Sequence, residues 1–128
     1  MTESNLARAK YTCNNVLAKS KKLRHVGYYD LFGKILCDSG REQLEPLKGE
    51  GVEEMHILNG TAASTVALWK RSDYLLGRLD AFIMIMEKVV DLIVPQQDTG
   101  SYFLAVFDPE TPMAEVERVR LSIIESTK

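Results

Sequence analysis

Three apolar runs in the second half of the chain constrain its fold more than any other feature of the sequence. They cover residues 79–86, 89–94 and 102–107, and the gaps between them are short enough to be β-hairpin turns. Polar residues do not occupy every second position of these runs, as they would in strands with one face in solvent. The pattern therefore predicts an antiparallel β-meander with apolar groups covering both faces of its sheet.

Two further β-rich segments come earlier in the chain. Residues 25–30 and 34–38 flank a short turn in which Gly33 can take a positive φ, and we predict a β-hairpin there. A mostly polar stretch with two glycines follows at residues 41–51. It is longer than most connections and offers little apolar surface to bury, so we expect it to be the least ordered internal loop.

Helical periodicity fills the remaining segments. Apolar residues recur at three- and four-residue steps from residue 4 to about 23, from 52 to about 74, and from 113 to 124. Each pattern predicts an amphipathic helix. We expect the second helix to be interrupted near Asn59 and Gly60, because a glycine in a helix interior costs about 1 kcal/mol relative to alanine.

Length and composition indicate one soluble domain, residues 1–128, without a strong overall field. Of the 128 residues 45% are hydrophobic and 27% are charged, and the net charge of -2 attracts neither nucleic acid nor an anionic membrane. The start lacks a secretory pattern and the chain has 2 cysteines, so we expect a cytoplasmic protein. The strongest local charge is a basic cluster at the end of the first predicted helix, where it suits the helix dipole: Lys19, Lys21, Lys22 and Arg24.

The predicted order, α-β-β-α-β-β-β-α, describes a compact α+β fold. The hairpin at residues 26–36 (VGYYDLFGKIL) and the last strand with its exit at residues 100–110 (GSYFLAVFDPE) resemble the corresponding parts of the roadblock/dynein light chain domain, which belongs to the profilin-like folds. Residues 23–47 are also similar to short archaeal proteins of this architecture. The resemblance implies a five-stranded antiparallel sheet with helices on both faces.

The same resemblance implies a function without catalysis. Roadblock-like domains are generally homodimers that bind other proteins, often as platforms or regulators of small Ras-like GTPases. We therefore expect a regulatory protein-interaction domain that binds itself and a protein partner, with no nucleic-acid or membrane partner. The alternative among profilin-like folds is a PAS-like small-molecule sensor, because fold alone does not fix function.

The chemistry-bearing residues support no enzyme. No phosphate-binding glycine loop or nucleophile elbow is present. His25, His56, Cys13 and Cys37 are spaced without a zinc pattern and lack an orienting third group for nucleophilic catalysis. We expect both cysteines to be packing residues, and we expect no catalytic site, cofactor or metal.

The expected dimer interface rests on the strand predicted at residues 79–86. In the predicted order this strand lies at the sheet edge, and without an internal lysine or proline an apolar edge must be covered. Pairing with its own copy around a two-fold axis covers it and brings the small-residue face of the middle helix near its copy. The expected interface residues are Phe82, Ile83, Met84 and Ile85 of the strand and Gly60, Ala63 and Ala67 of the helix.

The sensor alternative makes a different structural prediction. It requires an internal cavity between sheet and helix, close to Trp69 and Phe103. The interaction domain instead requires a filled core, in which Trp69, Met84 and Met86 are packing residues. An internal cavity at Trp69 therefore distinguishes the two hypotheses.

Overall fold

The structure, a computed structural model, describes residues 3–41, 51–70, 73–96 and 99–128, apart from the side chains of residues 51–59, 73 and 74. Its elements are listed here in chain order: α1 (Glu3–Leu17), β1 (Leu23–Tyr29), β2 (Ile35–Gly40), α2 (Gly51–Lys70), α3 (Asp73–Leu76), β3 (Phe82–Ile85), β4 (Val90–Pro95), β5 (Tyr102–Phe107) and α4 (Met113–Ser126). The predicted order is confirmed, with the short α3 as an addition after the middle helix.

The strands form one antiparallel sheet in the order β2-β1-β5-β4-β3. Strand β5 lies in the middle, where Ala105 pairs with Val26 of β1 on one side and with Leu92 of β4 on the other. Strands β2 and β3 are the two edges. The predicted hairpin and the predicted meander are therefore both present, joined through the β1–β5 pair.

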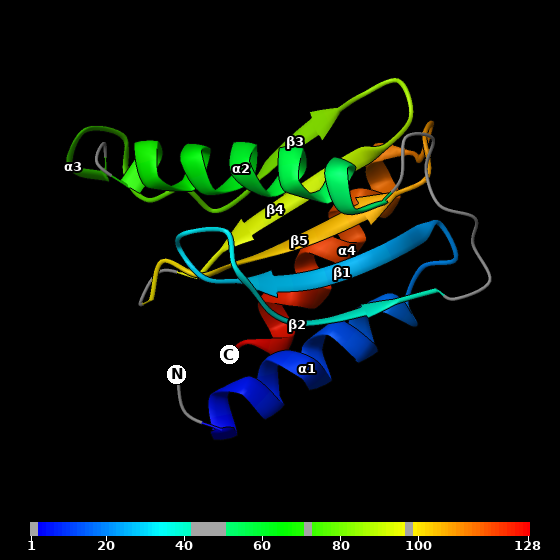
Figure 1. Cartoon of the computed structure of the whole chain (residues 1–128), viewed down its shortest axis with the longest axis horizontal. Coiled ribbons are helices and arrows are strands. Elements are labelled where there is room, and N and C mark those ends of the chain that lie inside the picture. The colour runs from blue at the N-terminus through cyan, green and yellow to red at the C-terminus, as the bar shows by residue number, and fades with distance from the viewer. Residues whose placement is uncertain (1–2, 42–50, 71–72, 97–98) are drawn as a thin grey trace.

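Helices cover both faces of the sheet, as the apolar runs predict (Figure 1). One face carries α1 and α4 and the other carries α2. The core on the first face is built from α1, β1, β4, β5 and α4, and includes Cys13, Val26, Leu92, Phe103 and Ile123. The core on the second face includes Tyr29, Ala62, Val66, Ile93 and Leu104. All residues of β5 are buried, so this strand has the two apolar faces that its sequence indicates.

The first helix is shorter than predicted. It ends at Leu17, and Leu23 is already the first residue of β1 and is fully buried. Between them Ser20 is also buried, and its hydroxyl donates to Glu115 of α4 and accepts from the backbone N–H of Lys22. The basic cluster therefore follows the helix instead of occupying its last turn, and Arg24 forms an ion pair with Asp108 at 2.6 Å.

The hairpin turn between β1 and β2 has the predicted geometry at Gly33, whose φ is 85°. Asp30 also contributes, because its carboxylate accepts hydrogen bonds of 2.9 Å from the backbone N–H groups of Phe32 and Lys34. An aspartate that bonds the backbone of the following residues is a common way to fix a tight turn. The turn thus has two independent local causes in the sequence.

Two other boundaries differ from the sequence-based expectation. Helix α2 runs without a break through Asn59 and Gly60, because a single glycine weakens a helix without ending it. Strand β3 is limited to Phe82–Ile85, half of the predicted run, and Arg78 and Asp80 before it form an exposed ion pair at 3.5 Å. Most of the loop expected at residues 41–51 lies outside the described residues.

Arg41 joins the end of α1 to the start of β1. Its guanidinium donates to the carbonyls of Leu17, Ser20 and Leu23 at 2.8, 2.5 and 2.6 Å. We expect Arg41→Ala to lower the free energy of unfolding by about 2–3 kcal/mol, since three partly buried carbonyls lose a charged donor. Arg41→Lys should recover only part of this loss, because one ammonium cannot reproduce the planar fork. Urea denaturation measures both, and a loss below about 0.5 kcal/mol for the alanine variant would show that water replaces the contacts.

Candidate functional site

The edge strand β3 has one hydrogen-bonding side without a partner strand in the described part of the chain. The backbone N–H of Met86 donates to the carbonyl of Val89 at 2.9 Å, so alternate residues back along β3 direct their backbone groups toward β4. The N–H and C=O groups of Ile83 and Ile85 therefore point outward. Two residues of the expected interface present backbone donors and acceptors to whatever lies beside the sheet.

The side chains of this edge are apolar on both faces. Phe82 and Met84 are half-buried and pack against the core under α2. Ile83 and Ile85 project from the other face and are 39% and 72% exposed, and Met86 beyond the strand is also exposed. The edge has neither the charges nor the proline that usually protect such strands.

The expected helical part of the interface lies on the outer surface of α2. Gly60 is exposed, and a Cβ added there would meet no atom within 4 Å. Ala63 is half-buried against the core under α2, and Ala67 is exposed. Ala67 lines a groove with Leu31 and Gly100, so this flank of the helix faces the β1–β2 turn, and the structure does not bring Ala67 beside β3.

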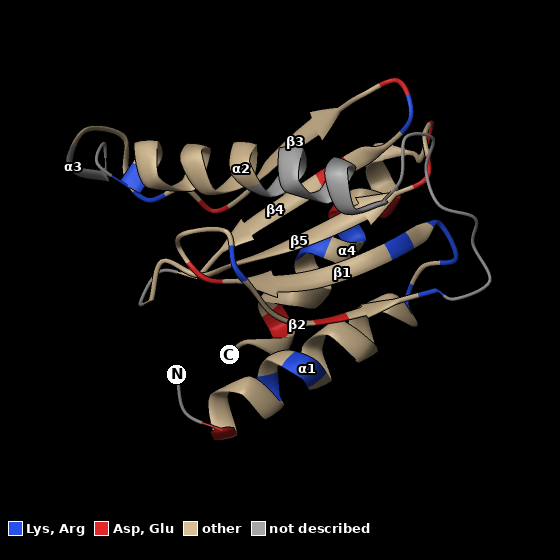
Figure 2. Ribbon diagram, viewed as in Figure 1, with Lys and Arg blue, Asp and Glu red and all other residues tan. Residues whose placement is uncertain are grey.

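That groove belongs to a second apolar surface, which the sequence did not reveal. It has a volume of about 310 Å³ and lies between the C-terminal half of α2 and the β1–β2 turn. Leu31 of the turn lines it and is exposed, as is Phe32 beside Leu31, and Lys70 of the helix also lines it. Figure 2 shows that α2 carries no charge between Gly60 and Trp69, which leaves this stretch of helix surface uncharged.

Trp69 is not a core residue, contrary to the prediction. It is 40% exposed, because the C-terminal end of α2 reaches past the ends of the strands and leaves no sheet beneath it (Figure 1). Met86 is exposed as well, and of the three expected packing residues Met84 alone contacts the core. Phe103 is buried on the face covered by α1 and α4. Trp69 and Phe103 are thus on opposite faces of the sheet and do not share the cavity that the sensor hypothesis places between them.

The structure brings the two cysteines together. Cys13 of α1 and Cys37 of β2 both pack into the core between α1 and the sheet, where each thiol influences the pKa of the other. Burial, followed by the neighbouring Cys37, raises the pKa of the Cys13 thiol to about 12, and burial also raises the pKa of Cys37. Both are therefore protonated packing residues at neutral pH.

His25 lies apart from the thiols. It pairs with Asp38 across the β1–β2 hairpin, with 2.7 Å between Nε2 and the carboxylate. Cys37 neighbours Asp38 in β2, so their side chains leave opposite faces of the strand and no histidine–thiol pair forms. The side chain of His56 lies outside the described residues. Among the side chains that the structure describes, which leave out those of residues 51–59, 73 and 74, no cluster of three or more His, Cys, Asp or Glu could hold a metal ion.

Among the described helices, none has both the length and the apolar character needed to cross a bilayer.

Asp91 is an unexpected charge in the core. It sits in the middle of β4 and is fully buried, and neither carboxylate oxygen has a hydrogen-bond partner among the described residues. Its neighbours along the strand, Val89 and Ile93, belong to the core under α2, so Asp91 faces α2. Burial alone raises the pKa of this carboxyl to about 7. The sequence did contain the signal, an acidic residue inside an apolar run.

Comparisons with known proteins identify the fold. No family model and no curated protein matches the sequence. Among solved structures, the gliding protein MglB of Thermus thermophilus is 14% identical, with a TM-score of 0.69 over 98% of this chain and 93% of that chain. MglB of Myxococcus xanthus is 17% identical, with a TM-score of 0.69 over 99% and 87%. A roadblock/LC7 domain from Streptomyces avermitilis is 9% identical, with a TM-score of 0.65 over 92% of both chains. The chain therefore has the roadblock/LC7 fold, as its sequence resemblance implied.

Asp91 should make stability depend on pH. Its pKa rises from 3.8 to about 7 on folding, so between these values the folded protein binds more protons than the unfolded chain. The free energy of unfolding should therefore be highest below pH 4 with respect to this group and should fall as the pH rises toward 7. Asp91→Asn should remove this fall and stabilise the protein by roughly 2–4 kcal/mol at pH 8. The control is Asp80→Asn at an exposed site, and equal pH profiles for the two variants in urea denaturation would contradict the assignment.

The thiols should be inert in the folded protein. A pKa of about 12 leaves almost no thiolate on Cys13 at pH 7, so iodoacetamide should modify it only after unfolding. Replacing both cysteines by alanine should cost roughly 1 kcal/mol or more per buried site while leaving oligomeric state unchanged. Rapid alkylation of native Cys13, followed by mass spectrometry, would show that this part of the core opens readily.

Proposed function

We propose that this chain is a non-catalytic regulatory domain that forms a homodimer through β3 and binds a protein partner. One observation carries the proposal: the apolar edge strand with outward-pointing backbone groups at Ile83 and Ile85. A strand of this kind directs pairing or aggregation unless another chain covers it. A second copy of the same strand is the simplest cover, because an antiparallel pair is self-complementary.

The geometry of β3 favours this pairing. Around a two-fold axis, the outward N–H and C=O groups of Ile83 and Ile85 can exchange hydrogen bonds with the same residues of a second copy. The exposed side chains of these isoleucines then meet across the seam on one face of a continuous sheet. Pairing of two β3 strands thus gives the outward N–H and C=O groups hydrogen-bond partners and covers the apolar side chains of the edge.

The outer surface of α2 contributes the second part of the proposed interface. The face formed by Gly60, Ala63 and Ala67 has small side chains, and the open space above Gly60 leaves room for another backbone. This face is the expected approach for the α2 of the second copy. Because Ala67 lies toward the β1–β2 turn, the β3 seam carries more of the argument than the helix does.

The partner surface follows from the exposed groove beside α2. The exposed side chains of Leu31 and Phe32 lie at or beside this groove, which Lys70 also lines, and exposed apolar side chains with a polar rim are typical of protein-binding sites. The sequence resemblance implies a small Ras-like GTPase as that partner. Protein assembly is also known for this fold, since MglB forms a tetrameric arrangement in one solved structure that matches this chain.

Charge at the edge tests the dimer. We expect Ile85→Lys to give a folded monomer, because two added charges would face each other across the seam, where like charges repel. The control is Leu121→Lys, which places a lysine at another exposed apolar site, 53% exposed against 72% for Ile85, on α4. Light scattering at tens of micromolar reports the mass, and a folded monomer for the unchanged protein would remove the basis of the proposal.

Two proline variants separate the seam from the fold. Ile83→Pro removes an outward donor and should abolish the dimer while leaving the β3–β4 pair intact. Met84→Pro removes an inward donor and should disrupt that pair, which circular dichroism and a lowered thermal midpoint would report. A dimer that survives Ile83→Pro would place the interface elsewhere.

Partner binding has its own test. Leu31→Glu should weaken capture of small Ras-like GTPases, loaded with either GDP or a GTP analogue, by placing a charge at an exposed apolar residue that lines the groove. Leu121→Glu is again the control. Equal capture by both variants would exclude this surface, and no capture by the unchanged dimer would exclude GTPases as the partner class.

A further inference from the structure

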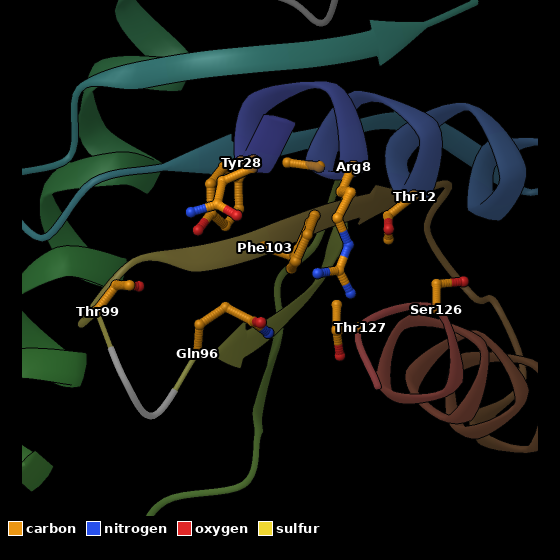
Figure 3. A pocket seen from close by; sticks show the side chains of 10 residues that line it. Arg8, Thr12, Tyr28, Gln96, Thr99, Phe103, Ser126 and Thr127 are labelled. Carbon is orange, nitrogen blue, oxygen red and sulfur yellow. The ribbon is translucent and has the colours of Figure 1, made fainter. Parts of the chain in front are cut away.

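A pocket lies on the opposite side of the sheet from α2. It has a volume of about 220 Å³ and is bounded by the first turns of α1, the end of α4, the sheet, and residues at the two ends of the β4–β5 turn. Figure 3 shows Arg8 reaching from α1 across this pocket toward Thr127, with Gln96 and Thr99 beside it. None of these residues belongs to the proposed dimer or partner surfaces.

The floor of the pocket is aromatic. Tyr28 of β1 and Phe103 of β5 pair in the sheet, and their rings are 4.6 Å apart between centroids at an angle of 41°. Both residues are buried, so the floor is held by the core and does not depend on a mobile side chain. Because Tyr28 is 6% and Phe103 is 1% exposed, the floor offers an apolar group of a ligand a narrow fixed surface, which comes mostly from Tyr28.

The rim of the pocket offers hydrogen-bond donors. Arg8 is the one charged residue among the described residues that line it, and no described acidic side chain pairs with its guanidinium, which reaches the carbonyl of Lys128 at 3.4 Å. The hydroxyl of Thr99 accepts from the N–H of Ser101, and the hydroxyl of Ser126 accepts from Asn15. The hydroxyl of Thr99 therefore keeps its own proton for an acceptor in the pocket, whereas the hydroxyl of Ser126 points away from Arg8 (Figure 3).

We propose that this pocket binds a small aromatic carboxylate. The guanidinium of Arg8 matches a carboxylate in shape and charge, and the hydroxyl of Thr99 supplies a further donor to ring substituents. A cavity of about 150 Å³ already holds benzene, so a volume of about 220 Å³ suits one ring with its acid group. The ring enters the pocket toward the exposed edge of Tyr28, and the carboxylate lies at the rim.

This site extends the function of the chain beyond the dimer. The sensor hypothesis placed a cavity between the sheet and α2, whereas the pocket lies between the sheet and the other two long helices. A ligand there touches α1, α4 and two strands at once, so it should stabilise the folded protein by mass action. The two functions are separable because the pocket and β3 share no residue.

Titration of the full chain with benzoate tests the proposal. Backbone amide shifts of Thr99 and Ser126 in NMR spectra should saturate with a dissociation constant of about 1 mM or below, as expected for so small a ligand. Benzamide lacks the charge and acetate lacks the ring, so the dissociation constant of each should be at least about tenfold higher than that of benzoate. Binding of acetate equal to that of benzoate would overturn the aromatic part, and equal binding of benzamide would overturn the anion part.

The variants locate the site. Arg8→Gln should weaken benzoate binding about tenfold, with Arg8→Lys in between, because lysine keeps the charge and loses the planar fork. Arg118→Gln is the matched control, since Arg118 is an exposed arginine at the other end of the α1–α4 layer, near Lys19. Equal affinity of Arg8→Gln and the unchanged protein, or shifts confined to α2, would overturn the proposal.

The monomeric variant completes the design. Ile85→Lys should bind benzoate as the unchanged protein does, because the pocket lies away from the seam. If light scattering shows a monomer, the dimer proposal is wrong but the benzoate titration still tests the pocket. If benzoate does not bind, the pocket proposal is wrong but light scattering still tests the dimer. Loss of benzoate binding on monomerisation would contradict the placement of the site within one chain.

Discussion

Burial of β5 on both faces is the constraint on which the rest of the structure depends. Every residue of this strand is buried, and its six residues alternate between the core under α1 and α4 and the core under α2. A strand without a polar face cannot remain in water, so neither helical layer is optional. The hairpin and the meander are held together by the same strand, because β1 and β4 both pair with it.

Coverage weakens from this centre toward the β3 edge. Phe82 and Met84 still contact the core under α2, but Ile83 and Ile85 project from the other face without full cover. Strand β3 is therefore an apolar edge of the sheet, and the pocket that Arg8 lines lies elsewhere, between the sheet and the α1–α4 layer. Asp91 lies between well-covered neighbours, and its carboxylate, without a hydrogen-bond partner among the described residues, makes the stability of the core under α2 depend on pH.

The sequence predicts features that depend on local patterns and misses those that depend on distant residues. The continuous apolar runs were sufficient for the sheet and its double cover, and Gly33 for the hairpin turn. The predicted C-terminal end of the first helix was wrong, because Leu23 fits the apolar stripe of that helix but is the first residue of β1. The prediction that Trp69 packs in the core was wrong, because the burial of a residue on α2 depends on how far the sheet extends beneath that helix. The contact of Cys13 with Cys37 and the pocket around Arg8 combine residues that no local pattern connects.

The pairing of β1 with β5 has a consequence for synthesis on the ribosome. Gly27 pairs with Leu104, so the β1–β2 hairpin emerges early while the strand that completes its other side is made near the end of the described chain. Contacts this distant in sequence form slowly because a long loop must close first. Until then the backbone N–H and C=O groups of β1 on that side have no strand to pair with, although α1, which is made first, packs on the Val26 and Tyr28 face. The nascent chain therefore carries an open strand edge at β1 until β5 becomes available, and such an edge is where wrong pairing begins.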